Sequence, residues 1–205
     1  MKLGVLDYGS GNIHSAAQAL TRLGAKVVVS SDWAKINSCD GLLLPGVGAF
    51  AAAMASLQGG GHVPPLLDWA GSGRPLLGVC VGHQVLFEAG DEHGVVTPGL
   101  GLLPGAVTRL EATRLPHMGW DEVIPPAGSA MFAGIATECF YFVHSYAARC
   151  PGSAGITWGR HEASDFVAAI EQGPLWGTQF HPEKSGEPGL KLLSNWIASL
   201  PHQLG

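Results

Sequence analysis

The sequence predicts an α/β fold in which helices flank a mostly parallel central sheet and a smaller antiparallel element lies beside it. As far as Cys80, short apolar runs alternate with helix-length segments, which is the pattern of a parallel sheet. After Val95 the pattern changes to short apolar pieces separated by Gly and Pro, and several later strands alternate apolar with polar residues. No internal repeat or linker interrupts the chain, so we expect a single domain over 1–205.

The elements follow in order along the chain. A buried-type strand over 3–6 precedes a helix from about Ile13 to Leu23, with Gly24 as its C-cap. The next strands are expected over 26–29, 41–44 and 76–77, and helices over 50–57 and 66–70. In the second half we expect strands over 139–143, 163–170 and 175–180, then an amphipathic helix over 189–200.

The composition narrows the class of protein. Hydrophobic residues make up 46% of the chain but charged residues only 13%, against roughly 25% in typical soluble domains, which is compatible with a surface covered by another protein. The net charge of −5 argues against a nucleic-acid partner. No apolar run approaches the ~18 residues of a membrane span, and no secretory signal is present. The four cysteines lack metal spacing, so we expect no metal, and we expect no cofactor either. Because no secretory signal is found and a chain of this size needs no disulfide, we expect a cytoplasmic protein.

The segment 78–84 has the shape of a nucleophile elbow with sulfur in place of oxygen. Cys80 follows an apolar strand, has a glycine two residues away on each side, and leads into an expected helix through 85–88. Glycines allow the tight turn, and a helix N-terminus favours the thiolate. An inert buried thiol is the alternative for an isolated cysteine.

A base for Cys80 is predicted at His181, which lies just past the last apolar strand. Glu183 follows two residues later, where its carboxylate can orient one ring nitrogen while the other faces the thiol. The chain order of nucleophile, histidine, acid differs from that of the α/β-hydrolases and disfavours that fold. His83 is a rival base by proximity, but helical geometry is expected to turn it away from Cys80.

Two further turns follow strands. Pro45-Gly46-Val47-Gly48 can aim a backbone N–H at a developing oxyanion, with the Val81 N–H as a second donor, although an ordinary strand-to-helix turn has the same sequence. The segment 7–12 suggests phosphate binding but lacks the full glycine pattern and the P-loop lysine, so we expect a structural or interface turn.

Together these segments resemble the class I, triad-type glutamine amidotransferases, a single-domain, flavodoxin-like α/β fold. Within that family they are most similar to the glutaminase subunits of imidazole glycerol phosphate synthase. The motifs that carry the resemblance span most of the chain and lie at 6–12, 45–48, 78–84, 116–120, 141–146 and 177–185.

The resemblance implies roles for particular residues. Cys80 would attack the glutamine carboxamide to form a thioester, with His181 as base and Glu183 orienting it. The oxyanion would lie near Gly46, Val47 and Val81. The substrate-binding residues implied are Gln84, His144, Ser145 and Tyr146. The ammonia would pass to a (β/α)8-barrel cyclase partner that makes imidazole glycerol phosphate and aminoimidazole carboxamide ribotide.

Three departures from the subfamily pattern keep alternatives open. His83 stands where a hydrophobic residue is more usual, Asp121 where asparagine is usual, and the loop 92–94 is also unusual. A glutaminase for another synthase, of the anthranilate or vitamin B6 type, and a non-catalytic scaffold of the same fold therefore remain as alternatives. The strings at 116–120 and 141–146 disfavour the first, and the intact Cys80, His181 and Glu183 disfavour the second.

Overall fold

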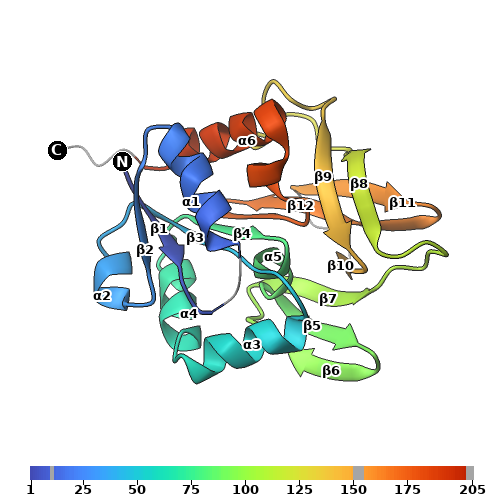
Figure 1. Cartoon of the computed structure of the whole chain (residues 1–205), viewed down its shortest axis with the longest axis horizontal. Helices are drawn as coiled ribbons and strands as arrows, with labels where there is room; N and C mark the ends of the chain where they lie inside the picture. The colour runs from blue at the N-terminus through green and yellow to red at the C-terminus, as the bar shows by residue number, and fades with distance from the viewer. Residues whose placement is uncertain (10–11, 150–154, 202–205) are drawn as a thin grey trace.

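A seven-stranded, mostly parallel sheet forms the centre of the molecule (Figure 1). The structure, a computed structural model, describes residues 1–9, 12–149 and 155–201. The sheet has the strand order β11-β12-β13-β4-β3-β1-β2, and only β11 and β12 pair antiparallel with their neighbours. Its strands are β1 (Lys2–Leu6), β2 (Lys26–Ser30), β3 (Gly41–Leu44), β4 (Leu76–Val79), β11 (Ile156–His161), β12 (Ser164–Gln172) and β13 (Leu175–Thr178).

Helices cover both faces of this sheet, because its central strands are apolar on both sides. Figure 1 shows α1 (Ile13–Arg22) and α6 (Gly186–Ser199) on one face, and α3 (Phe50–Gly59) and α4 (Val63–Gly71) on the other. The short α2 (Trp33–Ile36) follows β2. The predicted α/β fold with a mostly parallel sheet is therefore confirmed. No helix among the described residues is long and apolar enough to cross a membrane.

Two smaller sheets lie beside the carboxyl edge of the central one. One has the order β10-β7-β5-β6 and is antiparallel except between β5 and β7, and the other pairs β8 with β9 antiparallel. These sheets confirm the smaller antiparallel element. Their strands are β5 (Phe87–Glu92), β6 (Val95–Pro98), β7 (Leu103–Arg109), β8 (His117–Glu122), β9 (Cys139–His144) and β10 (Tyr146–Arg149).

The prediction of a helix through 85–88 is wrong. Helix α5 (Val81–Gln84) is a single turn, and strand β5 begins at Phe87. The carbonyl of Val85 accepts from the Leu100 N–H, and that of Leu86 from the N–H groups of Leu102 and Leu103. These long-range bonds draw the chain out of the helix. Strands β5, β10 and β11 and helix α2 were not predicted either.

The sheet order brings the predicted turns together. Strands β13, β4, β3 and β1 are neighbours and run parallel, so the segments after them meet at one edge of the sheet. Cys80 follows β4, the Pro45 turn follows β3, and His181 lies three residues beyond β13. Ser10 and Gly11 of the segment 7–12, and Cys150, lie outside the described residues.

Candidate active site

Cys80 occupies a strained turn between β4 and α5. Its φ of 54° and ψ of −112° place it in a region that non-glycine residues rarely adopt, and its N–H donates to the Thr178 carbonyl at 2.7 Å. A side chain at Gly78 would meet the backbone of Gly82, and one at Gly82 would meet the Leu44 carbonyl. The two glycines therefore permit the close backbone packing that holds the sulfur at the turn.

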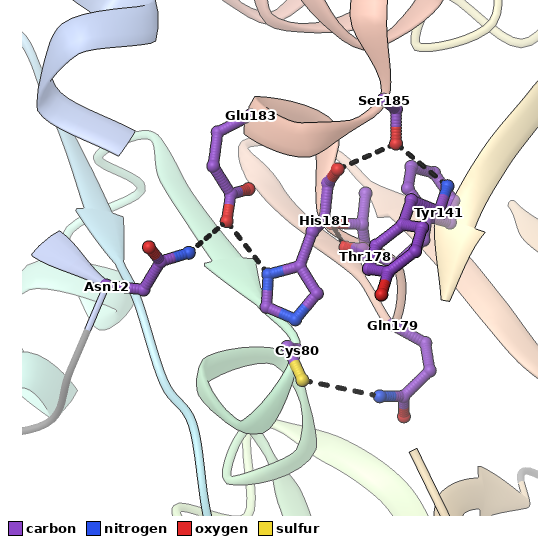
Figure 2. A network of polar contacts seen from close by, with 9 residues as sticks. Asn12, Cys80, Tyr141, Thr178, Gln179, His181, Glu183 and Ser185 are labelled. Carbon is purple, nitrogen blue, oxygen red and sulfur yellow. Dashed lines mark hydrogen bonds and ion pairs between the residues drawn. The ribbon is translucent and has the colours of Figure 1, made fainter. Parts of the chain in front are cut away.

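His181 lies between Cys80 and Glu183 (Figure 2). Its Nδ1 is 2.8 Å from Glu183 Oε1, which also accepts from Asn12 Nδ2 at 2.6 Å. The backbone of His181 is fixed as well, because its N–H donates to the Tyr141 carbonyl and its own carbonyl accepts from Ser185 Oγ. The structure thus brings together the three residues predicted as nucleophile, base and orienting acid.

The electrostatics of this group favour a charged imidazole. Burial alone would lower the pKa of His181, but hydrogen bonds to Cys80 and Glu183, together with their charges, raise it to about 9. A histidine that holds a proton this firmly, between a thiol and a carboxylate, fits a thiolate–imidazolium pair. The arrangement can therefore perform nucleophilic catalysis by sulfur.

A cavity of about 240 Å³ opens onto the Cys80 sulfur. Of the residues predicted for the site, its lining includes Val47, Cys80, Val81, Gln84, His144, Ser145, Tyr146 and His181. Of the other predicted site residues, Glu183 and Gly46 are not part of this lining. The lining also includes Glu92 and Lys184, which sequence reasoning did not assign to the site. Glu92 is the last residue of β5, a strand that was not predicted, so nothing in the local sequence indicated that it would line the cavity.

The predicted oxyanion segment packs tightly against the start of α5. A side chain at Gly46 would meet the backbone of Val81 and Gly82, which explains the glycine at this position. The Val81 N–H donates to the Gly46 carbonyl at 3.3 Å. In this arrangement one of the two expected oxyanion donors is already engaged within the protein.

A chain of hydrogen-bonded polar groups runs along another side of the cavity, where Gln84, His144 and Tyr146 line it. Gln84 Nε2 donates to the Tyr146 carbonyl and to Gln179 Oε1, each at 2.9 Å, and His144 Nδ1 lies 3.0 Å from the same carbonyl. Burial, with a smaller contribution from the charge of His117, lowers the pKa of His144 to about 3, so it is neutral at pH 7. His117 Nδ1 is 3.0 Å from His144 Nε2.

His83, the rival base, points away from the site. Its ring is fully buried against Gly177, where a Cβ would meet Nδ1, and edge-on to Phe87. The structure thus confirms that the ring is turned away from Cys80, as the sequence predicted. Among the described residues, no group of His, Cys, Asp and Glu is placed to hold a metal ion.

Comparisons with known proteins agree with this geometry. The family model for glutamine amidotransferase class-I matches residues 4–200. A solved structure described as a glutamine amidotransferase superposes with a TM-score of 0.72 at 21% identity, covering 95% of this chain and 98% of that one. Another, from Thermotoga maritima, has a TM-score of 0.65 at 14% identity, covering 97% and 81%. The chain belongs to the class-I glutamine amidotransferase family.

Relatives within the family are much closer. The chain is 54% identical over 200 residues to imidazole glycerol phosphate synthase subunit HisH of Mycobacterium bovis, covering 96% of this chain and 97% of the relative. It is 50% identical over 201 residues to the subunit of the same name from Cutibacterium acnes, covering 98% of each. Both matches extend over nearly the whole of each protein.

Proposed function

We propose that this chain is the glutaminase subunit of an imidazole glycerol phosphate synthase in histidine biosynthesis, acting as one domain over 1–205. The observation that carries the proposal is the line from Glu183 through His181 to Cys80, which lines a cavity. The identity of 50–54% with HisH subunits supports the pathway over an anthranilate or vitamin B6 synthase. A cytoplasmic location stays a prediction from the sequence.

The proposed reaction has two halves. The Cys80 thiolate attacks the carboxamide carbon of glutamine, and the His181 imidazolium gives its proton to the nitrogen, which leaves as ammonia. Neutral His181 then takes a proton from water, which attacks the thioester and releases glutamate. Glu183 keeps Nδ1 protonated and stabilises the positive ring, because its Oε1 accepts from that nitrogen.

The cavity has the groups to hold the amino-acid end of glutamine. Glu92 brings a carboxylate that suits the α-ammonium group, and Lys184 a cation that suits the α-carboxylate. Gln84 and the backbone of 144–146 line the same cavity and are fixed by the hydrogen bonds around the Tyr146 carbonyl. We assign these residues to substrate binding.

The oxyanion site is incomplete in this arrangement. Attack on the carboxamide creates an oxyanion that needs N–H donors, yet the Val81 N–H is held by the Gly46 carbonyl. Rotation of the Gly46–Val47 peptide would release this N–H and turn the Val47 N–H toward the oxyanion. We infer that docking of the cyclase favours the rotated form, so the isolated chain hydrolyses glutamine slowly.

An exposed apolar surface next to the cavity suits the (β/α)8-barrel cyclase as its partner. Met118 and Trp120 lie on β8, and Trp120 is 57% exposed although its ring packs on Tyr141. Val47 of the oxyanion turn is also exposed. Apolar groups exposed at the rim of an active site are typical of a protein interface.

Reconstitution tests the proposal. Mixed with the cyclase subunit of histidine biosynthesis and its nucleotide substrate, the chain should support glutamine-dependent product formation, whereas anthranilate and vitamin B6 synthases should give none. Lack of stimulation by the cyclase would overturn the pathway assignment. Cys80→Ala should remove glutamine hydrolysis in the complex but leave turnover with added ammonia. Undiminished hydrolysis in that variant would exclude the thioester.

A further inference from the structure

Cys80 has a second polar partner besides His181. The side-chain amide of Gln179 lies on the other side of the sulfur, with Nε2 donating to Sγ at 3.8 Å (Figure 2). Gln179 is completely buried, and its backbone N–H donates to the Ala168 carbonyl of β12 at 2.8 Å. This amide is therefore held in place beside the nucleophile.

The orientation of the Gln179 amide follows from its neighbours. The Tyr146 carbonyl can only accept, so the Gln84 atom facing it must be Nε2. The second N–H of that nitrogen then points at Gln179, which must present Oε1 to it. With its oxygen committed to Gln84, Gln179 can turn only its NH₂ group toward the sulfur.

The Tyr146 carbonyl that sets this order is itself fixed. His144 Nδ1 lies 3.0 Å from it, and His117 lies behind His144. A donor on His144 Nδ1 is consistent with the neutral ring that its burial enforces. The amide orientation at Cys80 is thus determined by a hydrogen-bonded chain that runs back through His144 to His117, whose Nε2 lies 3.2 Å from Asp121 Oδ2.

We propose that Gln179 is a catalytic residue that stabilises the Cys80 thiolate by donating a hydrogen bond to the sulfur, with Gln84 fixing its orientation. A hydrogen bond to an ionised acceptor is roughly twice as strong as one between neutral groups, so the donor favours thiolate over thiol. The inference rests on the proposed thioester chemistry for its role in turnover. Its effect on the sulfur needs no glutamine and is measured without it.

Two substitutions at Gln179 separate the donor from the acceptor. Gln179→Glu keeps an oxygen facing Gln84 and replaces the NH₂ donor with a second oxygen. Gln179→Met has a similar length, carries no charge and removes both groups. Gln172→Glu is the matched control, because it makes the same change at an exposed position near the amino end of β13, while Cys80 follows the carboxyl end of neighbouring β4.

The measurement is the rate of alkylation of Cys80 by iodoacetamide in the full-length chain from pH 5 to 10, read by mass spectrometry of the Cys80 peptide. Loss of one charge-assisted hydrogen bond should slow alkylation at pH 7 by about tenfold in Gln179→Met, and more in Gln179→Glu. The midpoint of the pH profile should rise in both variants and stay unchanged in Gln172→Glu. A structural disturbance would change the plateau at high pH and leave the midpoint in place.

Unchanged midpoints in both Gln179 variants would overturn the proposal, as would an equal rise in the Gln172→Glu control. If the Gln179 variants do not fold, Gln84→Met tests the orientation argument, because it frees the Gln179 amide to turn its oxygen toward the sulfur. Alkylation at pH 7 should then fall by about threefold, and no change would contradict the proposal. These outcomes stand even if the chain fails to hydrolyse glutamine with the cyclase, a failure that would count only against the proposed function.

Discussion

Two buried histidines near Cys80 differ sharply in how they hold a proton. His83 is three residues away along the chain, and burial lowers its pKa to about 3 against a small opposing effect of the Val167 backbone. His181 is nearly as buried, yet its pKa is raised to about 9. Neither ring nitrogen of His83 has a hydrogen-bond partner of normal geometry among the described residues, whereas His181 contacts both Cys80 and Glu183. Hydrogen-bond partners, and not nearness in the sequence, therefore decide which of the two histidines holds its proton near neutral pH.

The largest effect on turnover should come from removing the His181 ring, and removal of the His83 ring provides the comparison. His181→Gln removes the proposed general base, and we expect glutamine turnover in the assembled complex to fall about 10³-fold or more. His83→Leu removes only a ring packed under the turn and should leave turnover close to wild type. Steady-state ammonia production measured for both variants is the check. Comparable losses would mean that His83 takes part in the chemistry.

Glu183 is the carboxylate that bonds to His181 and that His83 lacks. Glu183→Gln keeps an oxygen for His181 Nδ1 but removes the charge that stabilises the imidazolium, so we expect turnover to fall about 10²-fold. The His181 imidazole should also titrate at lower pH than in the wild type, because the hydrogen bond and charge of Glu183 both raise its pKa. Side-chain ¹⁵N spectra of both proteins measure the change. An unaltered titration would show that Glu183 only positions the ring.

The sequence alone was sufficient to predict those site residues that belong to local sequence patterns. Cys80 stands between two glycines, and His181 and Glu183 form one short motif, so each was visible without knowledge of the fold. Their convergence was also predictable, because parallel strands bring their carboxyl ends to one edge of the sheet.

Contacts between distant segments were not predictable. Gln179 and Asn12 belong to the quoted motifs, but their roles depend on partners 99 and 171 residues away, respectively. The helix expected through 85–88 failed for the same kind of reason, since hydrogen bonds from the segment after Gly99 draw the chain into a strand. Local propensity does not register such long-range bonds.

The low pKa of His83 should also make the folded chain less stable in acid. The pKa of His83 in the folded chain, about 3, lies below the ordinary histidine value of 6.5, so at intermediate pH the unfolded chain binds a proton at this residue and the folded chain does not. The contribution of His83 to stability is therefore complete above pH 6.5 and is lost as the pH falls toward 3. At pH 4 the loss amounts to about 3 kcal/mol.

His83→Leu should remove this part of the acid sensitivity. Urea unfolding at pH 7 and pH 4 measures it: the drop in unfolding free energy between the two values should be smaller in the variant by about 3 kcal/mol. His14→Gln, at an exposed histidine, is the control and should behave like wild type. Equal drops in wild type and His83→Leu would mean that the folded chain protonates His83 readily.

The smallest effect is expected at Asn12, which donates to the same Glu183 oxygen that holds His181. Asn12 precedes α1 with a φ of 68°, and its side chain makes no capping bond to that helix. Asn12→Gly therefore suits the backbone and removes only the amide, so the free energy of unfolding should change little. With one hydrogen bond to the Glu183 carboxylate lost but its charge retained, kcat/KM for glutamine in the complex should fall about fivefold. A loss as large as that of Glu183→Gln would mean that the orientation of the carboxylate, more than its charge, distinguishes His181 from His83.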